Sequence, residues 1–180
     1  MTYIWQKPNK VLLESGKVKQ GYDGGSGWML SSKKKVSKLP KGSQIPLEID
    51  ANPLRYVHFR QIYSEVKAAP PASYGERRMD VLVAPNNIGL SKFFFDAQTH
   101  LLARVEELGE VSAYYKQIFE FMDYRDVDGV KLPFRIIHSS EQPGDGDEEL
   151  RYTKVEQNIP LKAELFSRPK GAVVVLGGKR

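Results

Sequence analysis

The chain has 180 residues, of which 41% are hydrophobic and 27% charged, so it holds enough apolar material for one folded domain, with or without appendages. It has no cysteine, which excludes disulfides, thiolate catalysis, cysteine-ligated zinc, iron–sulfur clusters and covalent c-type haem on this chain. The formal net charge of +5 is mild. For the basic run Lys33-Lys34-Lys35 we prefer a solvated strand end or loop to a nucleic-acid or lipid-headgroup patch.

The first residues lack the basic start, apolar stretch and small-residue cleavage site of a secretory signal. No apolar run is long enough to span a membrane, so we expect no transmembrane segment. Read literally, the sequence indicates a soluble cytoplasmic chain, although a fragment that starts inside a longer protein would look the same.

Turn signals divide the first 30 residues into short strands. Strand-like residues 3–14 are broken by Pro8-Asn9, and Ser15-Gly16 is a turn. The glycine cluster from Asp23 to Gly27 is a hairpin turn rather than a phosphate cradle, because no Lys-Ser/Thr pair and no helical pattern follow it. Trp28 then begins the returning strand.

The next stretch is predicted to be mostly irregular. Residues 33–44 are basic and punctuated by Pro and Gly, which indicates a loop. Residues 45–59 have the best helical spacing, interrupted or restarted at Pro53. Residues 66–75 contain two adjacent prolines and are interpreted as a linker-like connection.

The second half alternates in the manner of antiparallel strands joined by short turns, with no pattern for crossover helices. The strongest turn signal is Asp128-Gly129 between two alternating arms, because a type I′ turn needs a positive φ at both central residues. Strands are predicted around residues 79–83, 93–95, 101–105, 115–124, 130–138 and 150–155, followed by a short helical turn near 158–166 and an apolar tail at 170–180 that is an edge strand or a docking segment.

We find no constellation that supports catalysis, and we expect a non-enzymatic protein without metal or cofactor. The three histidines, His58, His100 and His138, lie far apart in sequence and lack metal-ligand spacing. No nucleophile elbow is present, and the acidic stretch 145–149 lacks the calcium-loop pattern.

Aromatic content is the most distinctive feature, with 8 Phe, 9 Tyr and 2 Trp. One modest helix cannot cover a sheet of this many strands, so the sheet curls on itself, leaves a groove for an apolar ligand or is covered by a partner. The candidate ligand-binding residues on the apolar face are Trp28, Phe93, Phe95, Leu101, Phe119, Phe121, Leu132 and Phe134.

Four motifs, taken in order, resemble the superfamily of the outer-membrane lipoprotein carrier, the LolA-like proteins. They are Gly21-Tyr-Asp-Gly24 with Trp28, Phe94-Phe95-Asp96-Ala97-x-Thr99 followed by Leu101-Leu102-x-Arg104, Asp123-Tyr-Arg-x-Val-Asp-Gly-Val-Lys-Leu-Pro-Phe134, and Asn158-x-Pro160 followed by Phe166-x-x-Pro169. The nearest likeness is to the acidobacterial-type domain that also follows the haem-binding part of reaction-centre-type cytochrome c subunits.

The resemblance implies a mainly β (α+β) fold: a strongly curved, unclosed antiparallel sheet with one or two short helices. It implies a single domain over residues 1–169, with the family's first helix and strands missing, and a tail at 170–180. The implied function is a periplasmic or cell-envelope module that holds a lipid or lipoprotein acyl chain on the concave face. The alternative is an interaction subunit of a membrane-associated electron-transfer complex, with a protein partner. No nucleic acid is expected to bind.

The sequence departs from the family pattern at one turn. The family commonly has glycine after the position of Thr99, and this chain has His100. It also lacks a haem-binding Cys-x-x-Cys-His motif.

Overall fold

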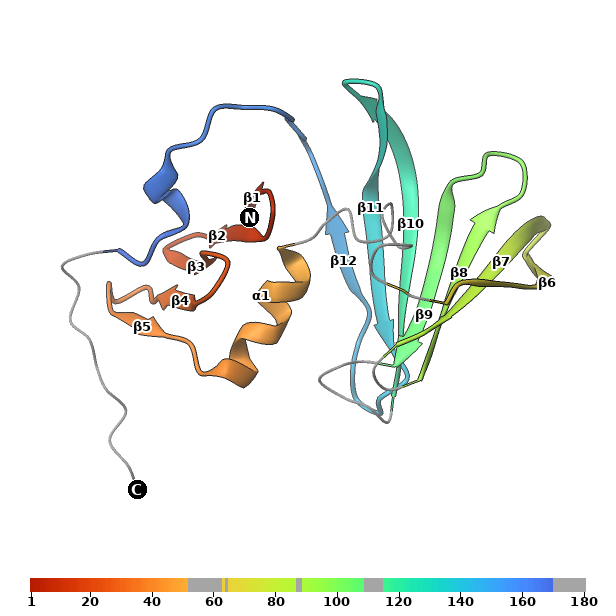
Figure 1. The fold of residues 1–180 in the computed structure, drawn as a ribbon, viewed down its shortest axis with the longest axis horizontal. Coiled ribbons are helices and arrows are strands. Elements are labelled where there is room, and N and C mark those ends of the chain that lie inside the picture. Colours follow the sequence, from red (N-terminus) through yellow and green to blue (C-terminus); the bar gives the residue numbers. More distant parts are fainter. Residues whose placement is uncertain (52–62, 64, 87–88, 109–114, 170–180) are drawn as a thin grey trace. The chain divides into compact units, whose positions relative to one another are not determined.

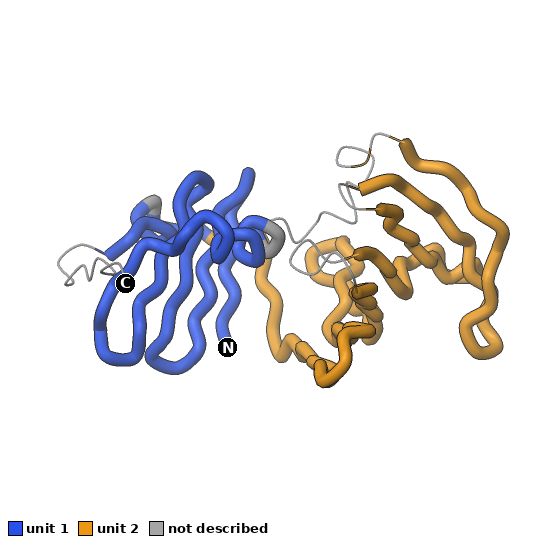
Figure 2. The backbone as a smooth tube through the Cα atoms, turned by 90° about the horizontal axis from the view of Figure 1, so that it is seen from below, with its two compact units in different colours: residues 1–58, 160–180 blue, residues 59–159 orange. Residues whose placement is uncertain are grey.

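The computed structural model describes residues 1–51, 63, 65–86, 89–108 and 115–169. It divides into two compact units, drawn in blue and orange in Figure 2. Unit 1 comprises Met1–His58 and Pro160–Arg180, and unit 2 comprises Phe59–Ile159. Each unit holds its own antiparallel sheet, and we describe each by itself (Figure 1).

Unit 1 is built on a five-stranded meander in which each strand pairs with the next along the chain. Tight turns at Pro8-Asn9, at Gly16 and at Gly24-Gly25 separate the first four strands, as the turn signals predict. The strands are β1 (Thr2–Gln6), β2 (Lys10–Ser15), β3 (Val18–Tyr22), β4 (Gly27–Leu30) and β5 (Val36–Lys38).

The two faces of this small sheet are covered by different short helices. Successive strand residues point to opposite faces, so Val11 and Leu12 of β2 belong to separate apolar clusters. Val11 packs with Tyr22 and with Leu47 of α1 (Ile45–Asp50). Leu12 packs with Trp28 and with Phe166 of the 3-10 helix η2 (Ala163–Phe166). Both β2 side chains are essentially unexposed, so unit 1 has a core on each side of its sheet.

The motif Gly21-Tyr-Asp-Gly24 with Trp28 has a packing explanation. Gly21 lies directly opposite Trp28 in the β3–β4 ladder, and the indole ring fills the space where a side chain at Gly21 would lie. The Trp28 ring nitrogen donates a 2.7 Å hydrogen bond to the carbonyl of Phe166. The Asp23 carboxylate accepts hydrogen bonds from the amides of Gly25 and Ser26 and holds the turn. The motif therefore ties a hairpin, a turn and the η2 segment together.

Unit 2 is a seven-stranded antiparallel sheet in which the chain again adds strands in order, from β6 at one edge to β12 at the other. β10 and β11 form its longest hairpin. The strands are β6 (Lys67–Tyr74), β7 (Arg77–Pro85), β8 (Leu90–Asp96), β9 (Leu102–Leu108), β10 (Lys116–Val127), β11 (Val130–Ser140) and β12 (Glu148–Arg151).

The hairpin at Asp128-Gly129 is confirmed. Both residues have positive φ, 50° and 81°, as a type I′ turn requires. The carboxylate of Asp126 accepts a 2.9 Å hydrogen bond from the amide of Gly129. Pro133 lies beyond the last β11 residue that pairs with β12, so its missing donor falls where the strand has a neighbour on one side only.

The mainly β fold class, with open antiparallel sheets and short helices, is confirmed. The linker predicted at 66–75 is wrong, because β6 occupies Lys67–Tyr74. An edge strand tolerates Pro70 and Pro71, and the register of its pairing with β7 shifts between Ala69 and Ala72 around them.

The loop predicted at 33–44 also needs correction, since it holds β5 and the 3-10 helix η1 (Lys41–Gln44). The helix predicted at 45–59 is present as α1 over Ile45–Asp50, while residues 52–62 lie outside the described residues, as do the tail at 170–180 and its predicted docking role. The assignment of 1–169 to one domain stays a prediction.

Candidate ligand-binding site

A row of four side chains crosses the centre of the seven-stranded sheet. Register places Phe93 of β8 opposite Val105 of β9, Val105 opposite Phe119 of β10, and Phe119 opposite His138 of β11. Directly paired residues on neighbouring strands point to the same face, so this row defines one surface, which we call the aromatic face. Next to the row on this face lie Leu82, Phe95, Phe121 and Ile136.

Some side chains of the aromatic face are buried and others are partly accessible to solvent. Phe93 and Val105 are fully buried, and Phe121 is nearly so. The ring of Tyr63 meets Phe93 edge to face, with centroids 5.2 Å apart. Leu82, Phe95, Phe119 and Ile136 are only half-buried. The buried side chains therefore belong to the core of unit 2, and the half-buried ones are those that an apolar ligand could touch.

Phe119 and His138 form the most defined element of this surface. Their rings stack with centroids 4.7 Å apart and planes inclined by 14°. His138 Nε2 is 2.7 Å from the side-chain oxygen of Gln117, and its Nδ1 lies 3.8 Å from Glu148. The imidazole is thus held by polar partners at its nitrogens while its ring stacks on that of Phe119, so the two rings form one fixed aromatic pair on this face.

At the β10–β11 turn the aromatic face ends under a charged side chain. The Arg125 guanidinium lies over the ring of Phe134, 4.4 Å from its centroid. The same guanidinium makes a two-pronged contact with Asp123, at 2.6 and 3.1 Å, and this hydrogen-bonded cation lowers the pKa of the Asp123 carboxyl. Phe134 is 7% exposed, so it is a packing residue at the edge of the surface.

The structure places two of the predicted site residues away from the aromatic face. Trp28 lies in the core of unit 1, not on the seven-stranded sheet. Leu101 lies in the β8–β9 turn, where its carbonyl accepts the Asp96 amide, so it is not a strand residue. Leu132, by contrast, shares the aromatic face with Phe134 and Ile136 by strand alternation, and it lies half-buried opposite Arg125 near the hairpin tip. Phe93, Phe95, Phe119 and Phe121 lie on the aromatic face, and that they bind a ligand stays a prediction.

The opposite face of the sheet, which we call the charged face, carries a cluster of ion pairs. Arg104 of β9 donates hydrogen bonds to Glu106 at 2.8 Å and to Glu120 of β10 at 2.9 Å. Further along, Glu149 of β12 accepts from Arg135 of β11. Burial lowers the pKa of Arg104, but hydrogen bonds and charges from its two glutamates outweigh that effect and raise it overall. Register also places Phe94 and the buried Met79 and Val81 on this face, so ion pairs and apolar side chains share it.

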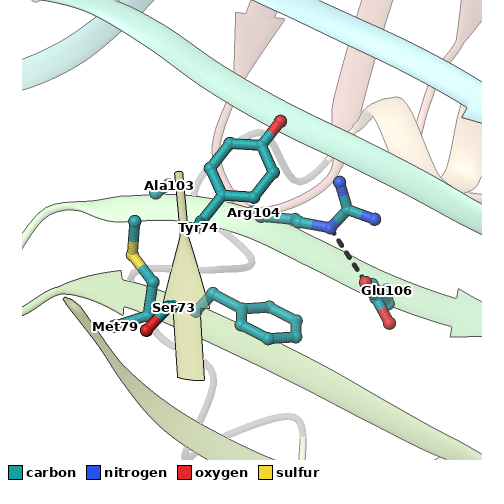
Figure 3. Close-up of a pocket in the computed structure, with 7 residues that line it drawn as sticks. Ser73, Tyr74, Met79, Ala103, Arg104 and Glu106 are labelled. Atoms are coloured by element: carbon teal, nitrogen blue, oxygen red, sulfur yellow. Dashed lines mark hydrogen bonds and ion pairs between the residues drawn. The ribbon is translucent and has the colours of Figure 1, made fainter. Parts of the chain in front are cut away.

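A small cavity of about 170 Å³ lies on this charged face (Figure 3). It is lined by apolar side chains that include Met79 and Phe94, with Arg104 and Glu106 beside them. Tyr74, from the edge strand β6, places its ring 5.5 Å from the Arg104 guanidinium. Its hydroxyl donates a hydrogen bond to Glu120, which raises the pKa of Tyr74. Sequence reasoning missed this cluster because Tyr74 falls in the stretch interpreted as a linker.

The Tyr74–Glu120 contact measures how strongly the sheet curves. β6 and β10 are separated by three strands, which in a flat sheet would put them about 19 Å apart. The two side chains together cannot span that distance, so at the β6 corner the sheet bends toward the charged face. That the aromatic face is the concave one therefore stays a prediction.

In class, this is a protein of open, curved antiparallel sheets with one aromatic face. Comparisons with family models and with curated proteins give no match. Among solved structures, the chain is similar to a LolA superfamily protein from Nitrosomonas europaea, with a TM-score of 0.61 and 11% identity over 89% of this chain and 77% of that one. It also aligns with a putative outer membrane lipoprotein-sorting protein domain from Vibrio parahaemolyticus, with a TM-score of 0.46 and 13% identity over 83% and 78%. The chain has a LolA-like fold.

Two further observations bear on the site. The described residues contain no group of three His, Cys, Asp or Glu side chains arranged to hold a metal ion. Among the helices that the structure describes, none is long and apolar enough to cross a membrane.

Proposed function

We propose that this protein is a non-enzymatic cell-envelope module that holds an apolar ligand, a lipid or a lipoprotein acyl chain, against the aromatic face. The observation that carries the proposal is the set of half-buried side chains, Leu82, Phe95, Phe119 and Ile136, beside the buried Phe93 and Val105 on one sheet face. Such a surface binds alkyl chains through the area removed from water, with little demand on polar groups.

The fold comparison supports the lipid class of ligand. The similar protein from Nitrosomonas europaea is a LolA superfamily protein. We propose, from the same resemblance, that the protein works in the periplasm or elsewhere in the cell envelope. Fractionation of the native source with antibody detection tests this location, and recovery in the cytoplasm alone would contradict it.

A pair of neighbouring residues on β10 gives a matched test of the site. Phe119 and Ile118 are adjacent, both half-buried, and point to opposite faces of the same strand. We expect Phe119→Ala to weaken binding of a fluorescent long-chain fatty acid by about tenfold, because an aromatic contact with an alkyl chain contributes about 1–2 kcal/mol. Ile118→Ala should bind the probe as the wild type does.

Thermal melts of both variants separate a binding effect from unfolding. Equal affinities of the two variants, with both folded, would show that the ligand does not lie on the aromatic face. A wild-type protein with no measurable affinity for the fatty acid would contradict the proposal itself.

The alternative is that a protein partner, as in an envelope electron-transfer complex, covers the same face. An exposed apolar face can bind either a lipid or a protein partner. Affinity capture from solubilised membranes of the native source distinguishes them: a stoichiometric protein partner lost in Phe119→Ala favours the alternative. The nearer likeness to the acidobacterial-type cytochrome subunit domain belongs to this alternative and stays a prediction.

A further inference from the structure

The charge of this chain is divided unequally between its units. Residues 1–58 and 160–180 hold 15 Lys and Arg against 5 Asp and Glu, a formal net charge of +10. Residues 59–159 hold 12 Lys and Arg against 17 Asp and Glu, a net charge of −5. Unit 1 is therefore strongly basic although the net charge of the whole chain is mild. The electrostatic field of a basic unit attracts polyanions or anionic surfaces.

Register gathers part of this charge at one end of the five-stranded sheet. In a meander, alternate turns lie at the same end, so the β2–β3 turn at Ser15-Gly16-Lys17 and the β4–β5 turn at residues 31–35 are neighbours. Both turns lie along the lower edge of the blue unit in Figure 2. This end, which we call the lysine rim, carries Lys17, Lys19, Lys33, Lys34 and Lys35.

The lysine rim is nearly free of compensating charge. Lys19 forms an ion pair with Glu14 across the β2–β3 hairpin. Lys17, Lys33, Lys34 and Lys35 are exposed and have no ion pair with the acidic residues that the structure describes. The two turns are two strand spacings apart, about 10 Å, which is comparable to the Debye length at physiological salt. Their charges therefore act together.

The β4–β5 turn is a defined structure rather than a loose loop. The Ser31 amide donates to the Lys35 carbonyl at 2.9 Å, and the Ser31 carbonyl accepts from the Lys34 amide at 2.9 Å. The Ser31 hydroxyl accepts from the Lys35 amide at 3.2 Å. Lys34 adopts a left-handed conformation with φ of 59°. The fold thus fixes three consecutive lysines outward on a turn.

We infer that the lysine rim docks the protein on the anionic surface of a lipid bilayer. The rim lies at one end of the sheet, where neighbouring strands turn, and exposed side chains on adjacent turns suit contact with a plane. It consists of lysines, which act as point charges, and lacks the interleaved aromatic rings that stack nucleic-acid bases. Lysine clusters of this size bind anionic headgroups, each lysine adding about fivefold to the affinity. The inference stands on charge and register, independently of the apolar-ligand proposal.

Vesicle sedimentation tests the inference with the full chain. We expect the protein to sediment with phosphatidylcholine vesicles that contain about 30 mol% phosphatidylglycerol, to leave them at about 0.5 M salt, and to ignore pure phosphatidylcholine. The variant Lys33→Gln/Lys34→Asn/Lys35→Gln should bind about 100-fold more weakly. Asparagine is chosen at Lys34 because it tolerates the left-handed conformation.

A matched control removes the same charge from the acidic unit. Lys67, Lys131 and Lys154 are exposed residues of unit 2, and their triple glutamine variant has the same net charge as the rim variant. It should sediment like the wild type, and circular dichroism checks that both variants fold. Equal binding of the two variants to the anionic vesicles, or wild-type binding to neutral vesicles that is as tight as to anionic ones, would overturn the inference. Tighter wild-type binding to a DNA oligonucleotide than to the vesicles would overturn it in favour of nucleic acid.

Discussion

Gly21→Ala tests the packing of unit 1 at its tightest point. A Cβ added at Gly21 would lie 2.4 Å from two carbons of the Trp28 indole and 2.7 Å from its nitrogen. Ordinary contacts between such atoms are about 3.5–4 Å, so the ring would have to move by about 1 Å or more. Trp28 cannot move freely, because it is 3% exposed, packs on Leu12 and Phe166, and donates its ring N–H to the Phe166 carbonyl.

The expected cost follows from these contacts. Overpacking a core costs about 1–3 kcal/mol, and pulling the indole N–H from its buried acceptor costs about 1–3 kcal/mol more. We therefore expect the free energy of unfolding to fall by about 3 kcal/mol, equivalent to a loss of about 6–12 °C in melting temperature for a chain of this size. Urea unfolding followed by tryptophan fluorescence measures this change.

Two further variants show whether the loss comes from the Gly21–Trp28 contact. Gly42→Ala is the control, because a Cβ there meets nothing within 4 Å and its backbone is not left-handed. Trp28→Leu removes the ring, so adding Gly21→Ala to it should cost almost nothing more, which a double-mutant cycle would show as strong coupling. A Gly21→Ala protein within about 0.5 kcal/mol of the wild type would refute the reasoning.

The remaining predictions concern a turn and the acid limit of stability. Gly129→Ala should lower the free energy of unfolding by about 1 kcal/mol through backbone strain alone, since φ is 81° and a Cβ would meet no atom within 4 Å. The affinity for fatty acid should not change. An unaltered melting temperature would contradict the positive φ assigned to Gly129. Asp96, Asp123 and Glu149 have lowered pKa values in the folded state. The cause is the backbone amide of Thr99 for Asp96, the guanidinium of Arg125 for Asp123 and the guanidinium of Arg135 for Glu149. Their stabilisation is present above the ordinary values of 3.8 and 4.5 and is lost as the pH falls through the folded values. The urea concentration at the unfolding midpoint should thus stay constant between about pH 7 and pH 5, and it should decrease once the pH is lower than about 4.5. A midpoint that increases on acidification would contradict this.

Local chemistry explains which parts of the fold could be predicted from sequence. Asp128-Gly129 specifies its own turn, because few residue pairs accept two positive φ values, and the alternation of Phe93 and Phe95 identifies their common face. His100 shows the same logic in reverse: its φ of 59° marks a position that favours glycine, as the family pattern implies. These features need no knowledge of distant residues.

The sequence-based predictions are wrong where contacts between distant parts of the chain determine the structure. Pro70-Pro71 signals a linker locally, yet an edge strand with an irregular register accepts both prolines. A period of two assigns Trp28 to an apolar face but cannot say to which sheet that face belongs. The Tyr74–Glu120–Arg104 cluster joins residues up to 46 positions apart and depends on the curvature of the sheet. No local pattern encodes such contacts.

Native mass spectrometry of the protein purified from its source, followed by lipid extraction, tests the central claim most directly. We predict bound species with the masses of lipids or acylated peptides, which are retained in Ile118→Ala and depleted in Phe119→Ala. A wild-type protein that carries no such species, and gains none when incubated with lipid, would contradict the account.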